Sequence, residues 1–185
     1  MSDTELRILD VGCGKRKHPG AIGIDVRENT DADVVHDLNA FPYPFADSEF
    51  DLILIRHTLE HLDDVIRVME EVHRIAKPGA KVVIDAPYFT SVDAFSDITH
   101  KHFFTSRSFD YFTDEIPSLD FYSPVRFKKL KVKVLFFAPR RAGWIKPQNW
   151  LGLGLLANHC TKIYEVFLAH IFPARAIHYE LEVLK

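Results

Sequence analysis

The sequence predicts an α/β fold with a doubly wound, mostly parallel sheet, and three observations support this prediction. Residues 6–11 form a short apolar run that leads directly into a turn containing Gly12 and Gly14. Residues 50–55 are almost continuously apolar, as expected of a parallel strand that is buried on both faces. Over residues 58–76 the apolar positions recur at three- and four-residue spacing, which predicts an amphipathic helix. Strand, helix and strand in alternation imply a doubly wound parallel sheet.

The segment between the first two strands is unusually short. A second strand is predicted at residues 22–25, ending in Asp25, and a third at residues 32–36. A parallel crossover normally holds a helix, but only residues 15–20 separate the glycine turn from the second strand. Because Pro19-Gly20 interrupts this segment, we expect the crossover helix to be shortened to about one turn.

The later elements follow from the same patterns. Lys77-Pro78-Gly79 is expected to end the first helix, and residues 80–86 return to β character. Residues 87–125 are interpreted as an insertion over the carboxyl edge of the sheet, with a short helix at 105–112. The other predicted elements are a long strand at 126–137, one helix or a broken pair at 149–172, and an alternating strand at 176–184.

Composition sets limits on the class of protein. With 185 residues, of which 47% are hydrophobic, the chain can form one domain with a substantial core. A net charge of −3 gives no general attraction to nucleic acid or anionic lipid. Cys13 and Cys160 make neither a disulfide framework nor a metal-ligand cluster. Charged residues interrupt the most apolar stretch at 150–173, so we expect no membrane span and a cytoplasmic location.

Two further features have more than one interpretation. The strand at 126–137 is predicted to carry Phe127, Lys129, Lys131 and Lys133 on one side, and these lysines could contact phosphate. Lysines that protect an outer strand from aggregation are the favoured interpretation. Trp144 and Trp150 could belong to a lid, a dimer surface or an interfacial anchor, and core packing is preferred.

Five short motifs follow one another in the first half of the chain. They are Leu9-Asp10-Val11-Gly12-Cys13-Gly14, Gly23-Ile24-Asp25, Asp37-Leu38, Phe50-Asp51-Leu52-Ile53 and Leu59-Glu60-His61-Leu62. In this order they resemble the class I S-adenosylmethionine-dependent methyltransferases, and most closely the small bacterial type-11 group, over about residues 5–90. A nicotinamide or flavin enzyme would require a third glycine where Lys17 stands, so a dehydrogenase fits less well.

The resemblance implies a complete architecture and an activity. The expected fold is a Rossmann-like, seven-stranded sheet that is mostly parallel with an antiparallel last strand, with a lid insertion after strand 5. One methyltransferase domain would span residues 1–185, with 87–125 and 140–175 as lid or acceptor-pocket elements. It would transfer a methyl group from S-adenosyl-L-methionine to an oxygen or nitrogen of a small-molecule acceptor, with no nucleic-acid partner.

Seven residues are expected to bind S-adenosyl-L-methionine. Gly12 and Gly14 allow the backbone to approach a ligand that a Cβ would exclude. Asp25 ends the second strand, where a carboxylate can accept hydrogen bonds from ribose hydroxyls; a solvated acid is the alternative. The resemblance implies that Asp10 orients the loop or meets the cofactor ammonium. The full set is Asp10, Gly12, Gly14, Asp25, Asp37, Leu38 and Arg56.

The resemblance implies the roles of Asp37 and Leu38, and the role of Arg56 is inferred from its position at the end of a strand. By resemblance, Asp37 would bind the exocyclic amine of adenine and Leu38 would cover the ring face; a turn cap by Asp37 is the alternative. Arg56 and His57 follow the fourth strand, beside the expected position of the sulfonium, and could instead be structural.

Histidines supply the candidates for a general base. His57, His100 and His102 qualify because imidazole titrates near neutral pH, although each could equally be a hydrogen-bonded histidine of the surface or lid. We predict no metal site. His57 and His61 lie four residues apart, but the family that the chain resembles commonly has Leu-Glu-His here without metal, and no third ligand is evident. Asp97, His100 and His102 would have to converge with His57.

Few residues in the sequence can be assigned to the acceptor pocket. Tyr88 and Phe89 are expected to line the acceptor pocket, because they follow the fifth strand. We interpret Asp85-Ala86-Pro87-Tyr88 as a proline-capped strand end, and not as the Asp-Pro-Pro-Tyr motif of nucleobase-methylating enzymes. The alternative function is a non-catalytic cofactor-binding or partner subunit with the same fold, motivated by the short first crossover.

Overall fold

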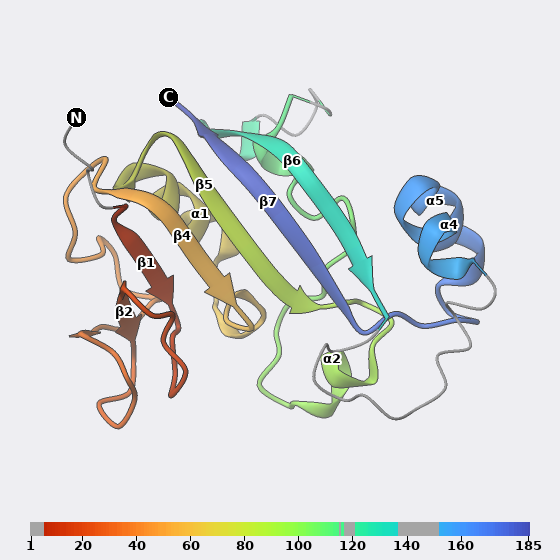
Figure 1. Cartoon of the computed structure of the whole chain (residues 1–185), viewed down its shortest axis with the longest axis horizontal. Helices are drawn as coiled ribbons and strands as arrows, with labels where there is room; N and C mark the ends of the chain where they lie inside the picture. Colours follow the sequence, from red (N-terminus) through yellow and green to blue (C-terminus); the bar gives the residue numbers. More distant parts are fainter. Residues whose placement is uncertain (1–5, 115, 117–120, 137–151) are drawn as a thin grey trace.

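The computed structural model describes residues 6–114, 116, 121–136 and 152–185. They form one seven-stranded sheet in the order β3-β2-β1-β4-β5-β7-β6 (Figure 1). Its strands are β1 (Ile8–Val11), β2 (Ala21–Asp25), β3 (Val34–Val35), β4 (Phe50–Arg56), β5 (Ala76–Pro87), β6 (Arg126–Leu135) and β7 (Ala176–Leu184).

The direction of the strands confirms the predicted fold class. Strands β1 to β5 pair in parallel, whereas β7 lies antiparallel between β5 and β6. The sheet is therefore a Rossmann-like α/β sheet, mostly parallel, with an antiparallel last strand. The carboxyl ends of the parallel strands share one edge, where α/β folds bind ligands.

The first crossover contains turns and no helix, so the predicted shortening is complete. The backbone after Val11 turns at Gly12 and re-enters the sheet at Ala21. A carboxylate oxygen of Asp10 fixes this loop by accepting a 2.7 Å hydrogen bond from the His18 amide. The side chain of Asp10, at the end of β1, therefore helps to hold the segment in which a parallel crossover normally contains a helix.

The predicted helix at 58–76 is wrong at its start. The segment begins as the short 3-10 helix η1 (Leu59–His61), Leu62 is extended, and α1 (Val65–Ile75) follows. Asp64 caps α1 by accepting a hydrogen bond from the Arg67 amide at 3.0 Å. The break separates Glu60 and His61 from the helix that their spacing had predicted.

Helix α1 ends where expected, but the residues that were expected to end it belong to the next strand. Helix α1 ends at Ile75, and the backbone becomes extended at Ala76, where β5 begins. Lys77-Pro78-Gly79 therefore lies within β5, at an irregularity in the pairing between β4 and β5. Gly79 has a φ of +76°, which a glycine adopts without steric cost.

The predicted face of β6 is wrong for two of its lysines. The register with β7 shifts between Lys129 and Lys131, so the residues on either side of the irregularity do not share one face. Lys129 accompanies the buried Phe127 and donates to the buried Asp110, with 2.6 Å between Nζ and Oδ1. Lys131 lies on the other face. The alternation of residues in the sequence does not reveal a bulge of this kind.

The remaining helices are short. The predicted helix at 105–112 reduces to turns and the 3-10 helix η2 (Asp110–Phe112). The predicted broken pair is confirmed in its described part. The other helices are α2 (Val92–Ser96), α4 (Leu153–His159), α5 (Thr161–Ile163) and the π-helical η4 (Tyr164–Leu168). Trp144, Trp150 and parts of 87–125 and 140–175 lie outside the described residues.

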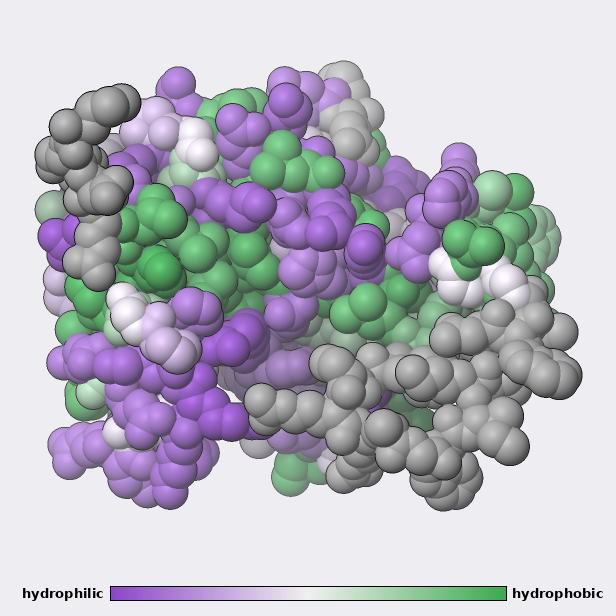
Figure 2. Space-filling view, in the orientation of Figure 1, coloured by the Kyte–Doolittle hydropathy of each residue, from purple (hydrophilic) through white to green (hydrophobic). Residues whose placement is uncertain are grey.

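The two faces of the sheet differ in polarity. Helix α1 lies behind the sheet in Figure 1, and its buried Val68, Met69 and Val72 belong to the main hydrophobic core. Figure 2 views the opposite face, where hydrophilic residues gather over the antiparallel strands. There Lys131 contacts Glu180 at 2.6 Å and His178 contacts Asp85 at 2.8 Å. In the part of the chain that the structure describes, no helix is long and apolar enough to span a membrane.

Candidate functional site

Gly12 holds the first turn tightly against the end of β4. Its amide donates to the Ile24 carbonyl at 2.8 Å, and its φ of +66° lies in the left-handed region. A Cβ at this position would lie 2.3 Å from Oγ1 of Thr58. The Thr58 hydroxyl donates to the Val11 carbonyl at 3.2 Å, so the contact that requires Gly12 also fixes β1 against β4.

Gly14 lies in the same turn but faces open space. Its φ is +55°, and a Cβ built on it would meet no atom within 4 Å. Its amide donates to one oxygen of Asp25 at 3.0 Å, and the Arg27 amide donates to the other at 3.0 Å. Because carboxylate oxygens accept more than one hydrogen bond, Asp25 can still accept from a ligand beside Gly14. These residues fit an adenosyl group with a diol.

Asp10 and Arg56 form an ion pair beneath this turn. Asp10 is 1% exposed, and its Oδ2 lies 2.6 Å from a guanidinium nitrogen of Arg56. Arg56 also donates to the Arg16 carbonyl at 3.2 Å. The structure therefore places both residues as supports of the loop, while their predicted contacts with the cofactor are not tested. Among the residues that sequence reasoning overlooked, Thr58 and His18 complete this support.

The surroundings of Cys13, the cysteine of the turn, disfavour its thiolate. Burial, followed by the nearby Asp25 and Asp10 carboxylates, raises the pKa of Cys13 to about 11. The thiol is therefore protonated at neutral pH, and covalent catalysis by this side chain is disfavoured.

Asp37 and Leu38 have structural roles in the described molecule. Asp37 is exposed and caps a turn, since its carboxylate accepts from the Asn39 amide at 2.9 Å. Leu38 is 5% exposed and belongs to the hydrophobic core. Their predicted contacts with adenine remain predictions.

Three histidines surround Glu60 at the end of β4. Glu60 is 1% exposed, and His57, in a left-handed conformation with φ of +53°, lies with Nδ1 3.5 Å from Oε1 of Glu60. This carboxylate raises the pKa of His57 above its ordinary value. On another side of Glu60, His61 and His100 pack edge to face with ring centroids 4.7 Å apart. Sequence reasoning noted the histidines but overlooked Glu60, because a helical pattern gave no sign that its carboxylate is buried.

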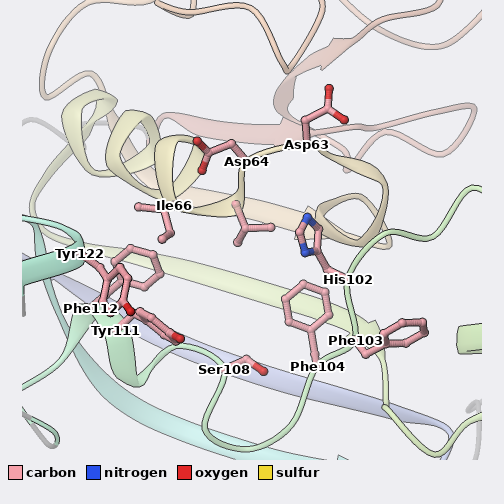
Figure 3. Close-up of a pocket in the computed structure, with 11 residues that line it drawn as sticks. Asp63, Asp64, Ile66, His102, Phe103, Phe104, Ser108, Tyr111, Phe112 and Tyr122 are labelled. Atoms are coloured by element: carbon pink, nitrogen blue, oxygen red, sulfur yellow. The ribbon is translucent and has the colours of Figure 1, made fainter. Parts of the chain in front are cut away.

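His102 belongs to a different surface. Its Nε2 donates to the Leu62 carbonyl at 2.9 Å, and its ring lines a groove of about 470 Å³ between the start of α1 and η2. Figure 3 shows His102 and Phe104 at one end of this groove and Tyr111 and Tyr122 at the other. The lining includes neither the glycine turn nor Asp25.

The predicted acceptor wall is only partly available. Tyr88 is fully buried and donates to Oε1 of Glu165 at 3.0 Å, so its hydroxyl is used within the fold. Glu165 also accepts from the Ser106 amide and hydroxyl, so it joins η4 both to Tyr88, next to the end of β5, and to the turn that contains Ser106. Phe89 is half-buried. The Asp85 carboxylate accepts from His178, consistent with a structural strand end.

Comparison with known proteins shows what the first half of the chain is similar to. Residues 9–84, about two fifths of the chain, match the model of a methyltransferase domain, and this stretch contains the glycine turn, Asp25 and Glu60. A demethylmenaquinone methyltransferase of Bacillus velezensis is 42% identical over 81 residues, which are 44% of this chain and 31% of that protein. Matches to such curated relatives span between about a fifth and two fifths of their length.

Solved structures share the fold of this chain over almost its whole length. A SAM-dependent methyltransferase from Archaeoglobus fulgidus superposes with a TM-score of 0.60 at 17% identity, covering 97% of this chain and 86% of that one. The [4+2]-cyclase SpnF gives 0.58 at 18% identity, covering 98% and 76%. Because a cyclase shares the fold, the fold alone does not identify the reaction.

Proposed function

We propose that this chain binds S-adenosyl-L-methionine and transfers its methyl group to an oxygen or nitrogen of a small-molecule acceptor. The observation that carries the proposal is the open space over Gly14 beside the Asp25 carboxylate. A backbone turn without a Cβ, next to a strand-end carboxylate, suits a ribose and its attached chain. A cytoplasmic location and a single domain over residues 1–185 remain predictions from the sequence.

The bound cofactor would supply an electrophilic methyl group, so the chain mainly aligns the reactants and excludes water. Asp25 would hold the ribose hydroxyls, and the Asp10–Arg56 pair would keep the turn in place. An acceptor that begins protonated requires a base. His57 and His100 lie at the edge of the sheet near Glu60, while His102 faces the groove, and they remain the candidates.

Calorimetric titration with S-adenosylhomocysteine tests the binding half of the proposal. Asp25→Ala removes a charged hydrogen-bond acceptor, so binding is expected to weaken by about 2–3 kcal/mol, or roughly 30- to 150-fold in Kd. Glu28→Ala removes an exposed carboxylate from the following loop and serves as the matched control. Unchanged affinity in Asp25→Ala, with tight binding to the wild-type protein, would remove Asp25 from the site.

The missing crossover helix supports a second candidate, a non-catalytic cofactor-binding or partner subunit. The N-terminus of such a helix offers backbone amides and a favourable dipole to a ligand, and here the first crossover has none. Transfer of labelled methyl from S-adenosylmethionine to a set of small hydroxyl- and amine-bearing acceptors separates the two. Binding without transfer to any acceptor would favour the non-catalytic candidate.

A further inference from the structure

Glu60 presents a buried charge that the described residues do not neutralise by hydrogen bonding. Its side chain is 1% exposed, and within the described part of the chain neither carboxylate oxygen has a hydrogen-bond donor. An isolated carboxylate loses its hydration on burial, so buried charges in folded proteins are normally paired or bound to metal. Its ion-pair partner among the described residues is His57, whose Nδ1 lies 3.5 Å from Oε1, so a directly bound cation would complete the site.

Two histidine rings approach the same carboxylate. One ligand atom each from Glu60, His61 and His100 can be chosen so that all three lie within 4.8 Å of one another. The histidine side chains come from η1 and from the segment after α2, which is held to η1 because the Lys101 amide donates to the Glu60 carbonyl at 2.7 Å. Backbone bonds thus fix the relative positions of the three side chains.

The surrounding hydrogen bonds determine which ring nitrogen is free. The Thr99 hydroxyl donates to Oδ1 of Asp97 at 2.7 Å, so its oxygen accepts from Nδ1–H of His61 at 2.8 Å. Nδ1–H of His100 donates to the Ala94 carbonyl at 2.9 Å. Nδ1 of each ring is therefore occupied, which leaves Nε2 available to a ligand; Nε2 of His100 also lies 4.0 Å from Oδ2 of Asp97. Metal-binding histidines are oriented by such bonds from their other nitrogen.

We propose that Glu60, His61 and His100 bind a first-row divalent transition-metal ion. Two imidazole nitrogens and one carboxylate suit Zn²⁺, Co²⁺, Fe²⁺ or Mn²⁺, whereas Mg²⁺ and Ca²⁺ prefer oxygen ligands throughout. The ion would add a directly bound positive charge to a carboxylate whose ion-pair partner, His57, lies 3.5 Å away. This replaces the sequence-based expectation of no metal site, which depended on the family resemblance and on the apparent absence of a third ligand.

The ion would also have a chemical use, and this part rests on the proposed function. Three protein ligands leave coordination positions for water or for a hydroxyl group of an acceptor. A metal lowers the pKa of a water or hydroxyl group that it binds. The cluster follows β4 at the sheet edge where the cofactor is proposed to bind. A hydroxyl-bearing acceptor is therefore the class of substrate that this site favours.

Titration of EDTA-treated protein with Co²⁺ tests the site directly, by calorimetry and by the visible absorption of the bound ion. The wild-type protein is expected to bind one equivalent with bands typical of nitrogen and oxygen ligands. Glu60→Gln should lose at least roughly 100-fold in affinity, and Thr99→Val, which removes the bond that orients His61, roughly 10-fold. His102→Gln, a histidine change in the same segment but outside the cluster, should retain wild-type affinity.

Two results would overturn the proposal: a wild-type protein that binds no stoichiometric Co²⁺, or a Glu60→Gln variant that binds as well as wild type. Circular dichroism and titration with S-adenosylhomocysteine on the same variant show whether it folds. Should Glu60→Gln fail to fold, His100→Asn takes its place with the same expected loss. Metal binding is measured without cofactor, so failure of the metal site and failure of the cofactor site are separate outcomes.

Discussion

The glycine turn and the Glu60 cluster lie at the same edge of the sheet, and each contains a buried carboxylate. The two carboxylates differ in their hydrogen-bond donors. Asp10 is 1% exposed and accepts hydrogen bonds from the His18 amide and the Arg56 guanidinium. Glu60 is equally buried, yet its oxygens have no hydrogen-bond donor among the described residues. The turn is thus completed by the chain itself, whereas the cluster fits the cation that we propose.

The largest effect is expected from the turn. Gly12→Ala should lower the free energy of unfolding by about 2–5 kcal/mol, since its Cβ would meet Thr58 and its φ is positive. Gly14→Ala should cost only about 1–2 kcal/mol, because φ alone is strained. Urea unfolding measures both changes, and titration with S-adenosylhomocysteine should show at least a tenfold loss for Gly14→Ala. Wild-type binding by Gly14→Ala would contradict a ligand at this turn.

Neutralising the two buried carboxylates sharpens the comparison, because the expected signs are opposite. Asp10→Asn should destabilise the protein by about 2 kcal/mol, since Arg56 loses its charged partner. Glu60→Gln should stabilise the metal-free protein by about 1 kcal/mol, because it removes a buried charge that has no hydrogen-bond donor among the described residues and whose ion-pair partner, His57, lies 3.5 Å away. Urea unfolding in EDTA measures both. Equal destabilisation by the two changes would show that Glu60 is satisfied within the fold.

The smallest effect is expected on the polar face, where the charges are paired and partly hydrated. Asp85, and to a lesser degree Glu180, raise the pKa of His178 above its ordinary value of 6.5. A raised folded-state pKa stabilises the fold below the unfolded pKa, and this contribution is lost as pH rises through the folded pKa. His178→Gln should therefore cost about 0.5–1 kcal/mol at pH 5.5 and close to nothing at pH 9.

Urea unfolding of both proteins at the two pH values measures this difference. Glu182→Gln, a change on the same strand outside the histidine pair, controls for a general effect of charge. A loss of stability in His178→Gln that is the same at both pH values would contradict the electrostatic origin.

Much of the fold could be predicted because the relevant signals are local. The bounds predicted for the last strand agree with β7, since strict alternation of Ile177, Tyr179, Leu181 and Val183 requires only one buried face. A shortened first crossover was predicted from the few residues between the strands and from Pro19-Gly20, although the structure has turns there and not the single helical turn that was expected. The start of α1 and the face of Lys131 were predicted wrongly, because a capping bond at Asp64 and a bulge in β6 depend on neighbouring elements.

By itself the sequence determined the order of the elements, the resemblance to methyltransferase domains and the turn at which a ligand is expected, since each depends on residues that are close in the chain. Only the tertiary structure decided that Thr58 requires Gly12 and that Arg56 supports Asp10. It also decided that His100, far along the chain, joins Glu60 and His61. Convergence of this kind depends on the burial of charge and the closure of loops, which no local pattern encodes.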